Sequence, residues 1–182
     1  KNYLKSKIFM NVVAIVQARL GSKRFPEKVL KKISNKPMLI VLLERLRFAK
    51  TLNKIIVAIP KNKKDNKLEK IIKKKNYTCF RGSELNVLRR FYIAAKEYKA
   101  DIIVRITSDN PLTDPGLIDK IVEKLIKEKK DYTSCRLINY PLGVGAEAFT
   151  FKALEKIYHL AKSKYHKEHV TSYFSKNKKS FK

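Results

Sequence analysis

The sequence predicts a single α/β domain over residues 1–182, a three-layer sandwich with a mostly parallel sheet between two layers of helices. Two observations lead to this prediction. Short runs rich in β-branched residues alternate along the chain with longer segments in which apolar residues recur at helical spacing. The short runs lack polar alternation, which is typical of strands covered on both faces. With 182 residues, 44% of them hydrophobic, the chain can build one sizeable core.

Five segments have the pattern of strands. Four are continuous apolar runs or close to it, and the second of these is ended by Pro60. The fifth follows a glycine-containing stretch in which the pattern loosens. The predicted strands are 12–16, 54–59, 77–80, 101–106 and 147–151.

Helices are predicted in the intervals between these strands. Asn35 and Pro37 precede the first helix, Asp65 can cap the second, and Ser83 precedes the third. Asp114 followed by Pro115 is a strong start for the fourth, since proline suits the first helical position. Two further helices are expected at the C-terminal end, at about 151–163 and 166–175.

The composition is strongly basic, with 43 Lys and Arg against 16 Asp and Glu and a formal net charge of +27. The basic residues are mostly lysines scattered through nearly every predicted helix. A nucleic-acid-binding protein would be expected to show clustered arginines and interleaved aromatic residues, and no such stripe is present. A lysine-rich solvated surface that helps to attract anionic nucleotides is therefore favoured over a dedicated nucleic-acid role.

The cysteines and the apolar runs indicate a cytoplasmic protein. Cys79 and Cys135 are far apart and form no Cys-x-x-Cys motif, so buried thiols in a reducing compartment are expected. No apolar run reaches the length of about 20 residues that a transmembrane helix needs. Residues 1–9 lack the features of a signal peptide and are interpreted as an extension before the first strand.

The segment from Ala14 to Leu30 is the first functional candidate. Its strand ends at Gln17, and the following loop gathers cations around a Gly-Ser bend: Arg19, Gly21, Ser22, Lys23, Arg24 and Lys28. Gly21 is expected to permit a bend that is closed to other residues. Two like charges about 4 Å apart repel by about 4 kcal/mol at an effective dielectric of about 20, so such a loop favours a bound triphosphate. The alternative is a solvated basic loop, and the Walker pattern is absent.

Two further loops are expected at the same edge of the sheet, because ligands of open parallel sheets bind beyond the carboxyl ends of the strands. Thr107 to Pro111 brings the carboxylate of Asp109, which could hold Mg²⁺ together with phosphate oxygens or could serve an Asx-type turn. Arg81-Gly82-Ser83 follows the predicted third strand, and Ser83 could contact a nucleotide or cap a helix. Arg105 lies inside a predicted strand and is either an organiser of the site or half of a structural ion pair.

Four stretches of the chain, in order, resemble the sugar cytidylyltransferases, a group that includes acylneuraminate and 3-deoxy-manno-octulosonate cytidylyltransferases. Residues 18–28 resemble the signature Ala-Arg-x-Gly-Ser-x-Arg-Leu/Phe-Pro-x-Lys. The other three stretches are Phe80-Arg-Gly-Ser-Glu-Leu-Asn-Val-Leu88, Val104-Arg-Ile-Thr-Ser-Asp-Asn-Pro-Leu112 and Glu168-His-Val-Thr171. The most similar branch is that of the spore coat polysaccharide biosynthesis protein F.

The resemblance implies a Rossmann-like fold of the nucleotide-diphospho-sugar transferase type and a Mg²⁺-dependent reaction. CMP would pass from CTP to an acidic sugar with release of pyrophosphate, and the protein would be a homodimer. The implied catalytic residues are Arg19, Lys28 and Asp109, with Asp109 as the metal ligand. The implied nucleotide-binding residues are Ala18, Arg19, Gly21, Ser22, Arg24, Lys28, Arg81, Gly82 and Ser83. Arg105 and Glu147 are the candidates for contact with the sugar, although Glu147 could equally be a solvated residue at a strand end.

The chain departs from the family pattern at two places. Asn86 stands where the family usually has an aspartate, so contacts that need a carboxylate there are not expected. Family members also carry a further aspartate in a Val-Asp-Thr-Pro-type stretch that is not found in these 182 residues. Transfer of another nucleotide, nucleotide binding without full activity, and nucleic-acid binding are the alternative functions.

Overall fold

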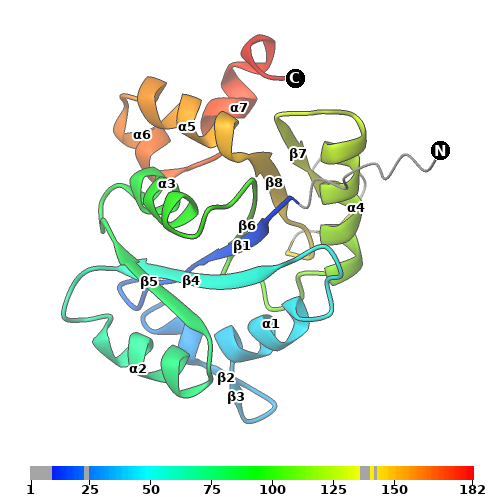
Figure 1. Ribbon diagram of the computed structural model, residues 1–182. Helices are drawn as coiled ribbons and strands as arrows, with labels where there is room; N and C mark the ends of the chain where they lie inside the picture. Colours follow the sequence, from blue (N-terminus) through cyan, green and yellow to red (C-terminus); the bar gives the residue numbers. More distant parts are fainter. Residues whose placement is uncertain (1–9, 23–24, 136–139, 142) are drawn as a thin grey trace.

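A computed structural model of the chain describes residues 10–22, 25–135, 140–141 and 143–182. It has three layers, with one mixed sheet between two layers of helices (Figure 1). The six strands lie in the order β5-β4-β1-β6-β8-β7. The predicted α/β sandwich with a mostly parallel sheet is confirmed.

The centre of the sheet is parallel and one edge is antiparallel. β1 (Val12–Gln17) pairs parallel with β4 (Lys54–Pro60) and with β6 (Ile102–Thr107), and β5 (Thr78–Gly82) pairs parallel with β4. β8 (Glu147–Thr150) runs antiparallel to β6, and β7 (Tyr132–Ser134) runs antiparallel to β8. β7 precedes the stretch in which the sequence pattern loosens, and β8 follows it.

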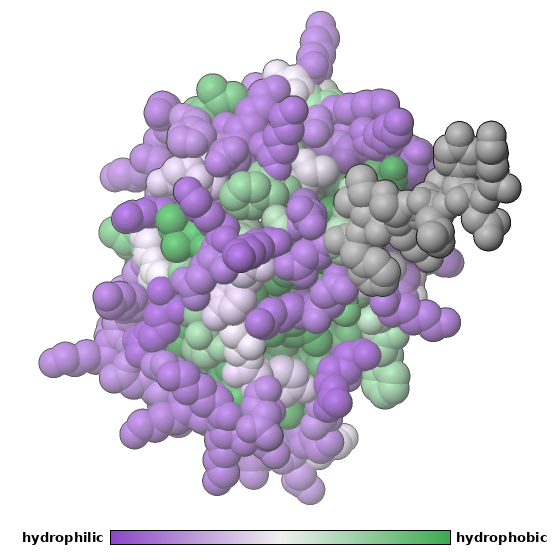
Figure 2. All heavy atoms as spheres, in the orientation of Figure 1, coloured by the Kyte–Doolittle hydropathy of each residue, from purple (hydrophilic) through white to green (hydrophobic). Residues whose placement is uncertain are grey.

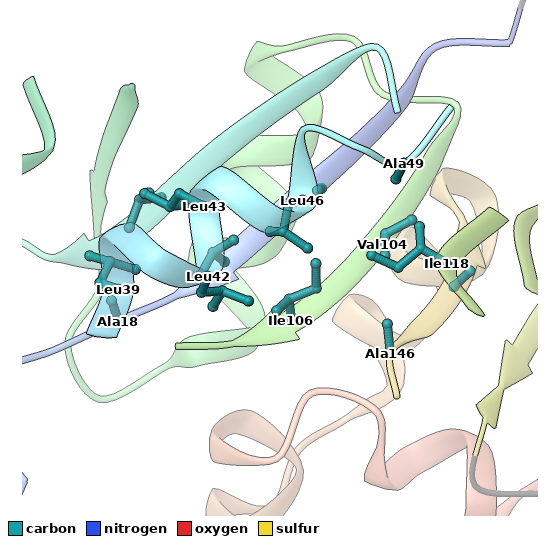
Figure 3. Close-up of a cluster of buried hydrophobic side chains, with 14 of the residues drawn as sticks. Ala18, Leu39, Leu42, Leu43, Leu46, Ala49, Val104, Ile106, Ile118 and Ala146 are labelled. Carbon is teal, nitrogen blue, oxygen red and sulfur yellow. The ribbon is translucent and has the colours of Figure 1, made fainter. Parts of the chain in front are cut away.

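The alternation of side chains along β1 divides the core into two parts. Ala14 and Val16 belong to one cluster of buried residues, and Val13 and Ile15 belong to the other. The first cluster packs under α1 (Met38–Leu46), α2 (Asn66–Lys74) and α4 (Pro115–Lys127). The second packs under α3 (Val87–Glu97), α5 (Phe151–Leu160) and α7 (Ser172–Lys176), with α6 (Lys164–Glu168) between the last two. Figure 3 shows the leucines of α1 beside Val104 and Ile106 of β6.

A small hairpin was not predicted. β2 (Lys32–Ile33) and β3 (Lys36–Pro37) pair antiparallel after a 3₁₀ turn, Lys28–Leu30. Ser34 and Asn35 connect them with φ angles of 47° and 66°, the left-handed conformation that two-residue hairpin turns require. Asn35 therefore belongs to this turn, and Pro37 occupies the N-cap position of α1.

Three other boundaries differ from the prediction. The two predicted C-terminal helices are three, because the second is divided into α6, which ends at Glu168, and α7, which begins at Ser172. Ser163 begins α6 by accepting a hydrogen bond from the His166 amide at 3.2 Å. β5 continues through Gly82, so Arg81 and Gly82 lie inside the strand rather than after it. β7 was not predicted because three residues are too few to show a period.

Hydrophilic residues cover most of the face shown in Figure 2, in agreement with the prediction of a lysine-rich solvated surface. Within the described part of the chain, no helix is long and apolar enough to cross a membrane.

The strand order fixes the place of the site. From β1 the chain moves outward to β4 and β5, then returns to place β6 on the other side of β1. β1 and β6 are adjacent and parallel, so the connections that leave their carboxyl ends start side by side at one edge of the sheet, and open α/β sheets bind ligands in the crevice at this edge.

Candidate active site

The loop after β1 is folded around one backbone carbonyl. The Leu20 carbonyl accepts hydrogen bonds from the Ser22 amide at 2.8 Å and from the Glu27 amide at 3.2 Å. Ala18 is buried and its amide donates to the Ala58 carbonyl of β4 at 3.3 Å. Arg19 is exposed, as the prediction of a phosphate-binding side chain requires. Arg24 lies outside the described residues.

The expectation for Gly21 is wrong. A Cβ atom at Gly21 would meet no atom of the described residues within 4 Å, and the φ angle of Gly21 lies outside the left-handed range. Among the described residues of this loop, Glu27 is left-handed, with φ of 49°. An alanine would fit at position 21, so this glycine leaves open space beside the loop without being required by the bend.

The loops after β1 and β6 meet through an ion pair. The Lys28 ammonium donates to Asp109 Oδ2, across 81 positions of the sequence. The two side chains are 27% and 42% exposed, so the pair lies at the surface of the crevice. Partial burial acts to raise the pKa of Asp109, but hydrogen bonds from Lys28 and Thr107 outweigh it and hold this pKa below its ordinary value. The expected meeting of the two loops at one edge of the sheet is confirmed.

Asp109 is a suitable but incomplete ligand for Mg²⁺. Its carboxylate is ionised and accessible, whereas the turn that follows is closed mainly by backbone, with the Asn110 amide donating to the Thr107 carbonyl at 3.1 Å. Among the described residues, no group of three His, Cys, Asp or Glu side chains could hold a metal ion. Mg²⁺ is commonly bound by one or two carboxylates together with phosphate oxygens, so Asp109 fits a metal that arrives with a nucleotide.

The Arg81 side chain is directed to α2 rather than to the crevice. Its Nη1 donates to Glu69 at 2.6 Å and to Asn66 at 2.7 Å, and its Nη2 donates to the Asn62 carbonyl. These partners occupy both terminal nitrogens, which corrects the expectation that Arg81 contacts the nucleotide. Arg81 holds the connection between β4 and α2.

Gly82 and Ser83 also have structural partners. A Cβ atom at Gly82 would lie 2.8 Å from Cγ of Arg90, so this glycine allows the buried arginine to pack against the strand. The expectation that Ser83 caps α3 is wrong. Its Oγ accepts from the Asn86 amide at 3.1 Å, and Asn86 is the N-cap, accepting from the Arg89 amide at 2.8 Å. The asparagine therefore keeps the capping role that an aspartate could fill at this position.

A cavity of about 590 Å³ opens beside the loop of Asp109. Its described lining comes from β6, from the connection after it, and from the segment that leads into β8. The lining includes Arg105, Thr107, Asn110, Tyr140, Gly145 and Glu147. A hollow of about 620 Å³ lies at the opposite ends of β4 and β5, around Lys54, Lys75 and Tyr77. That hollow is far from the loops that carry the candidate residues, so we assign the site to the first cavity.

Arg105 and Glu147 form a buried ion pair in the wall of this cavity. Arg105 Nη1 donates to Glu147 Oε2 and its Nε donates to Gln17 Oε1 at 3.2 Å. Glu147 also accepts from the Tyr132 hydroxyl at 2.6 Å and from the Thr171 hydroxyl at 3.0 Å. The two charged side chains are only 13% and 9% exposed. Arg105 is thus half of an ion pair, its role as an organiser of the site stays a prediction, and Glu147 is not a solvated residue.

The prediction missed one residue that contacts the cationic loop directly. Asp65 was expected to cap α2, but its side chain makes no capping hydrogen bond and instead accepts from the Leu20 amide at 2.8 Å. Only the burial of Asp65, which is 1% exposed, distinguishes it from an ordinary cap, and the sequence carries no signal of that burial. The role of Asp114 as the N-cap of α4 is confirmed by its bond from the Leu117 amide at 2.8 Å.

Comparison with known proteins gives consistent matches along the chain. An uncharacterized protein of Methanocaldococcus jannaschii is 50% identical over 173 residues, which is 95% of this chain and 70% of that protein. The spore coat polysaccharide biosynthesis protein SpsF of Bacillus subtilis is 34% identical over 168 residues, 90% of this chain and 69% of its own length.

Solved structures agree with these sequence matches. A cytidylyltransferase from Leptospira borgpetersenii superimposes with a TM-score of 0.89 at 34% identity, covering 94% of this chain and 74% of that structure. The fold is also that of CMP:2-keto-3-deoxy-manno-octonic acid synthetase, with a TM-score of 0.69 at 18% identity, over 84% of this chain and 79% of that one. The sequence model of the cytidylyltransferase family matches residues 13–182, and the chain therefore belongs to the cytidylyltransferase family, whose members are nucleotidyltransferases.

Proposed function

We propose that this chain transfers CMP from CTP to a hydroxyl group of an acidic sugar and releases pyrophosphate. The observation that carries the proposal is the Lys28–Asp109 pair, which joins the cationic loop after β1 to a lone carboxylate after β6, beside a cavity of about 590 Å³. Cationic side chains for the phosphates, a carboxylate for Mg²⁺ and space for an acceptor would thus lie together where the strand order reverses, beside β1.

The residues of the two loops would neutralise and align the triphosphate. Arg19 and Lys28 would bind phosphate oxygens, because charge-assisted hydrogen bonds to phosphate are among the strongest that side chains make. Asp109 would hold Mg²⁺, which supplies charge neutralisation on the phosphates when bound. Ala18, Gly21 and Ser22 of this loop would line the nucleotide site, and the open space beside Gly21 would leave room for the nucleotide.

The chemical step would be an in-line substitution. The acceptor oxygen forms a bond to the α-phosphorus of CTP as its proton passes to solvent, the bond from that phosphorus to the bridging oxygen breaks, and pyrophosphate leaves with the electron pair. No nucleophilic side chain is needed, because alignment and charge stabilisation supply the rate enhancement. The cavity wall would position the acceptor through the Arg105–Glu147 pair.

The names of the relatives support the choice of CTP and of a sugar for a surface polysaccharide. SpsF is a spore coat polysaccharide biosynthesis protein, and a 3-deoxy-manno-octulosonate cytidylyltransferase of Pelobacter propionicus is 31% identical over 121 residues. Those residues make up 65% of this chain and 46% of the Pelobacter protein.

A pyrophosphate-release assay with each of the four ribonucleoside triphosphates, Mg²⁺ and a panel of nonulosonic acids tests the proposal. We expect release with CTP that depends on both Mg²⁺ and an acceptor. Release with another triphosphate would change the base assignment. A complete lack of turnover with CTP, together with tight RNA binding that falls steeply with salt, would refute the enzyme function in favour of nucleic-acid binding.

We also propose a homodimer in the cytoplasm. The support for the location is that Cys79 and Cys135 are both free thiols, as expected in a reducing compartment. Light scattering coupled to size-exclusion chromatography tests the oligomeric state, and a mass of one chain at micromolar concentration would refute the dimer.

A further inference from the structure

Asp65 is a buried carboxylate that contacts the cationic loop from behind. It is 1% exposed, and its Oδ1 accepts the Leu20 amide at 2.8 Å, across 45 positions of the sequence. Asp65 is the N-cap residue of α2, but its side chain makes no capping hydrogen bond there. Its carboxylate therefore serves the Leu20 amide and not the helix. A buried carboxylate is costly unless it is hydrogen-bonded, so the contact with Leu20 gives this burial a structural reason.

Leu20 is the residue around which the loop is folded. Its carbonyl receives the amides of Ser22 and Glu27, while its amide is held by Asp65. Its side chain is buried at 6% exposure, whereas Arg19 beside it is exposed. The position of Arg19 relative to the crevice therefore depends on the hydrogen bond from the Leu20 amide to Asp65.

Asp65 is itself held by hydrogen bonds within the connection between β4 and α2. The Asp65 amide donates to Asn62 Oδ1 at 2.9 Å, and the Asn62 carbonyl accepts Nη2 of Arg81. Arg81 is fixed in turn by Glu69, at 2.6 Å. A continuous chain of hydrogen bonds thus runs from β5 through the β4–α2 connection to the backbone of the loop.

A buried cation offsets the negative charge that Asp65 brings close to a phosphate site. Arg90 is 3% exposed and its Nη1 donates to the Ser83 carbonyl at 2.6 Å. Burial, and to a smaller extent the charge of Arg19, lower the pKa of Arg90 to about 10, although the charges of Asp65 and Glu84 act to raise it. Arg90 remains charged at neutral pH and lies within the electrostatic reach of both Arg19 and Asp65.

We propose that Asp65 is a positioning residue for the triphosphate, whose buried carboxylate fixes the Leu20 amide and thereby holds Arg19 and the cationic loop in the binding conformation. This inference rests on the proposed function, since it assumes that the loop binds phosphates. It assigns to the connection between β4 and α2 a part in nucleotide affinity, although this connection supplies no group that touches the nucleotide.

The test compares Asp65→Ala with Asp119→Ala. Asp119 is a matched control, because it also anchors backbone amides of a distant loop: it accepts from Thr51 at 2.8 Å and from Lys50 at 3.0 Å. Thr51 and Lys50 lie before β4, at the end of the strand away from the crevice. Loss of either carboxylate should lower the melting temperature, but only the loss of Asp65 should change phosphate binding.

Binding is measured by titration calorimetry with inorganic triphosphate in the presence of Mg²⁺, and separately with CTP. We expect Asp65→Ala to weaken both about tenfold, the order expected for a buried hydrogen bond to a charged group. Asp119→Ala should bind both within twofold of the wild type. Asp65→Asn keeps an oxygen that can accept the Leu20 amide, so it should recover most of the lost affinity and be weaker by about threefold.

The binding readout separates this inference from the proposed function. If the wild type releases no pyrophosphate but Asp65→Ala still binds inorganic triphosphate tenfold more weakly than Asp119→Ala, the function is refuted and the positioning role is supported. If Asp65→Ala binds like Asp119→Ala, the positioning role is refuted, even when CTP is turned over. A wild type that binds no triphosphate refutes it as well. If Asp65→Ala does not fold, binding by Asp65→Asn equal to that of the wild type is the refuting result.

Discussion

The Arg105–Glu147 pair gives a strong prediction, because replacement of Glu147 by alanine leaves a cation inside the protein without its anion. Glu147 accepts hydrogen bonds from Arg105, Tyr132 and Thr171. The Arg105 side chain is 13% exposed, so water cannot replace the lost carboxylate fully. Breaking a buried ion pair from one side typically costs about 3–5 kcal/mol. For a chain of this size, about 2–4 °C of melting temperature is lost per kcal/mol, so we expect a fall of roughly 6–20 °C.

Urea unfolding at pH 7, followed by circular dichroism, measures this cost. Glu155→Ala is a matched control, since Glu155 accepts a hydrogen bond from the Tyr92 hydroxyl at 3.1 Å and should cost about 1 kcal/mol. The double variant Arg105→Met with Glu147→Leu should lose less than Glu147→Ala alone, because it leaves no unpaired charge. If Glu147→Ala costs no more than Glu155→Ala, the pair is hydrated and the reasoning about the cavity wall is wrong.

Three further predictions concern the crevice and one thiol. Asp109→Asn and Arg19→Ala should each lower the rate of pyrophosphate release about 100-fold or more while changing the free energy of unfolding by less than about 1 kcal/mol; wild-type rates in both would refute the site assignment. The pKa of Asp109 is lowered in the folded state, so its pair with Lys28 contributes stability above the unfolded pKa near 3.9 and loses it as the pH falls below about 4. Because Asp109 is 42% exposed, this contribution should stay below about 1 kcal/mol, and the urea midpoints of wild type and Asp109→Asn should approach each other as the pH falls through the lowered pKa of Asp109. Burial raises the pKa of Cys79 to about 11, so its thiolate should be about 100-fold scarcer at pH 8 than in the unfolded chain, and an aromatic disulfide reagent should label it rapidly only after unfolding.

The sequence was sufficient to predict the parallel strands and the meeting of the two loops. The run from Val12 to Val16 and the run from Asp101 to Ile106 lack polar alternation, which is the pattern of a strand covered on both sides. Once the strands are parallel, the loops that follow them must share an edge. The pairing of Lys28 with Asp109 is a direct result of that geometry.

The direction of individual side chains could not be predicted in the same way. Arg81 and Arg19 both occur in stretches that resemble the family, yet Arg81 is paired with Glu69 of α2 while Arg19 is exposed. Asp65 has the sequence pattern of a helix cap, and only the tertiary fold brings the Leu20 amide to its side chain. Such pairings depend on the packing of elements far apart in the sequence, and a single sequence records no signal of them.

The expectation for Gly21 failed for a different reason. Glycine in a loop next to cations is typical of a bend with a left-handed residue, but here Glu27 and Asn35 adopt that conformation. The space beside Gly21 among the described residues shows that backbone geometry is not what requires a glycine at this position.

The change of winding direction at β1 links ligand binding to the folding of the whole domain. The two loops of the crevice belong to halves of the sheet that are joined only through β1, and Lys28 and Asp109 are 81 positions apart. A partly folded chain that has formed β1, β4 and β5 but has not yet docked β6 would hold only one of the two loops. A triphosphate at 100 times its dissociation constant would therefore favour the complete native state by about 2.7 kcal/mol, and every structural probe should report the same ligand-induced shift in the unfolding transition.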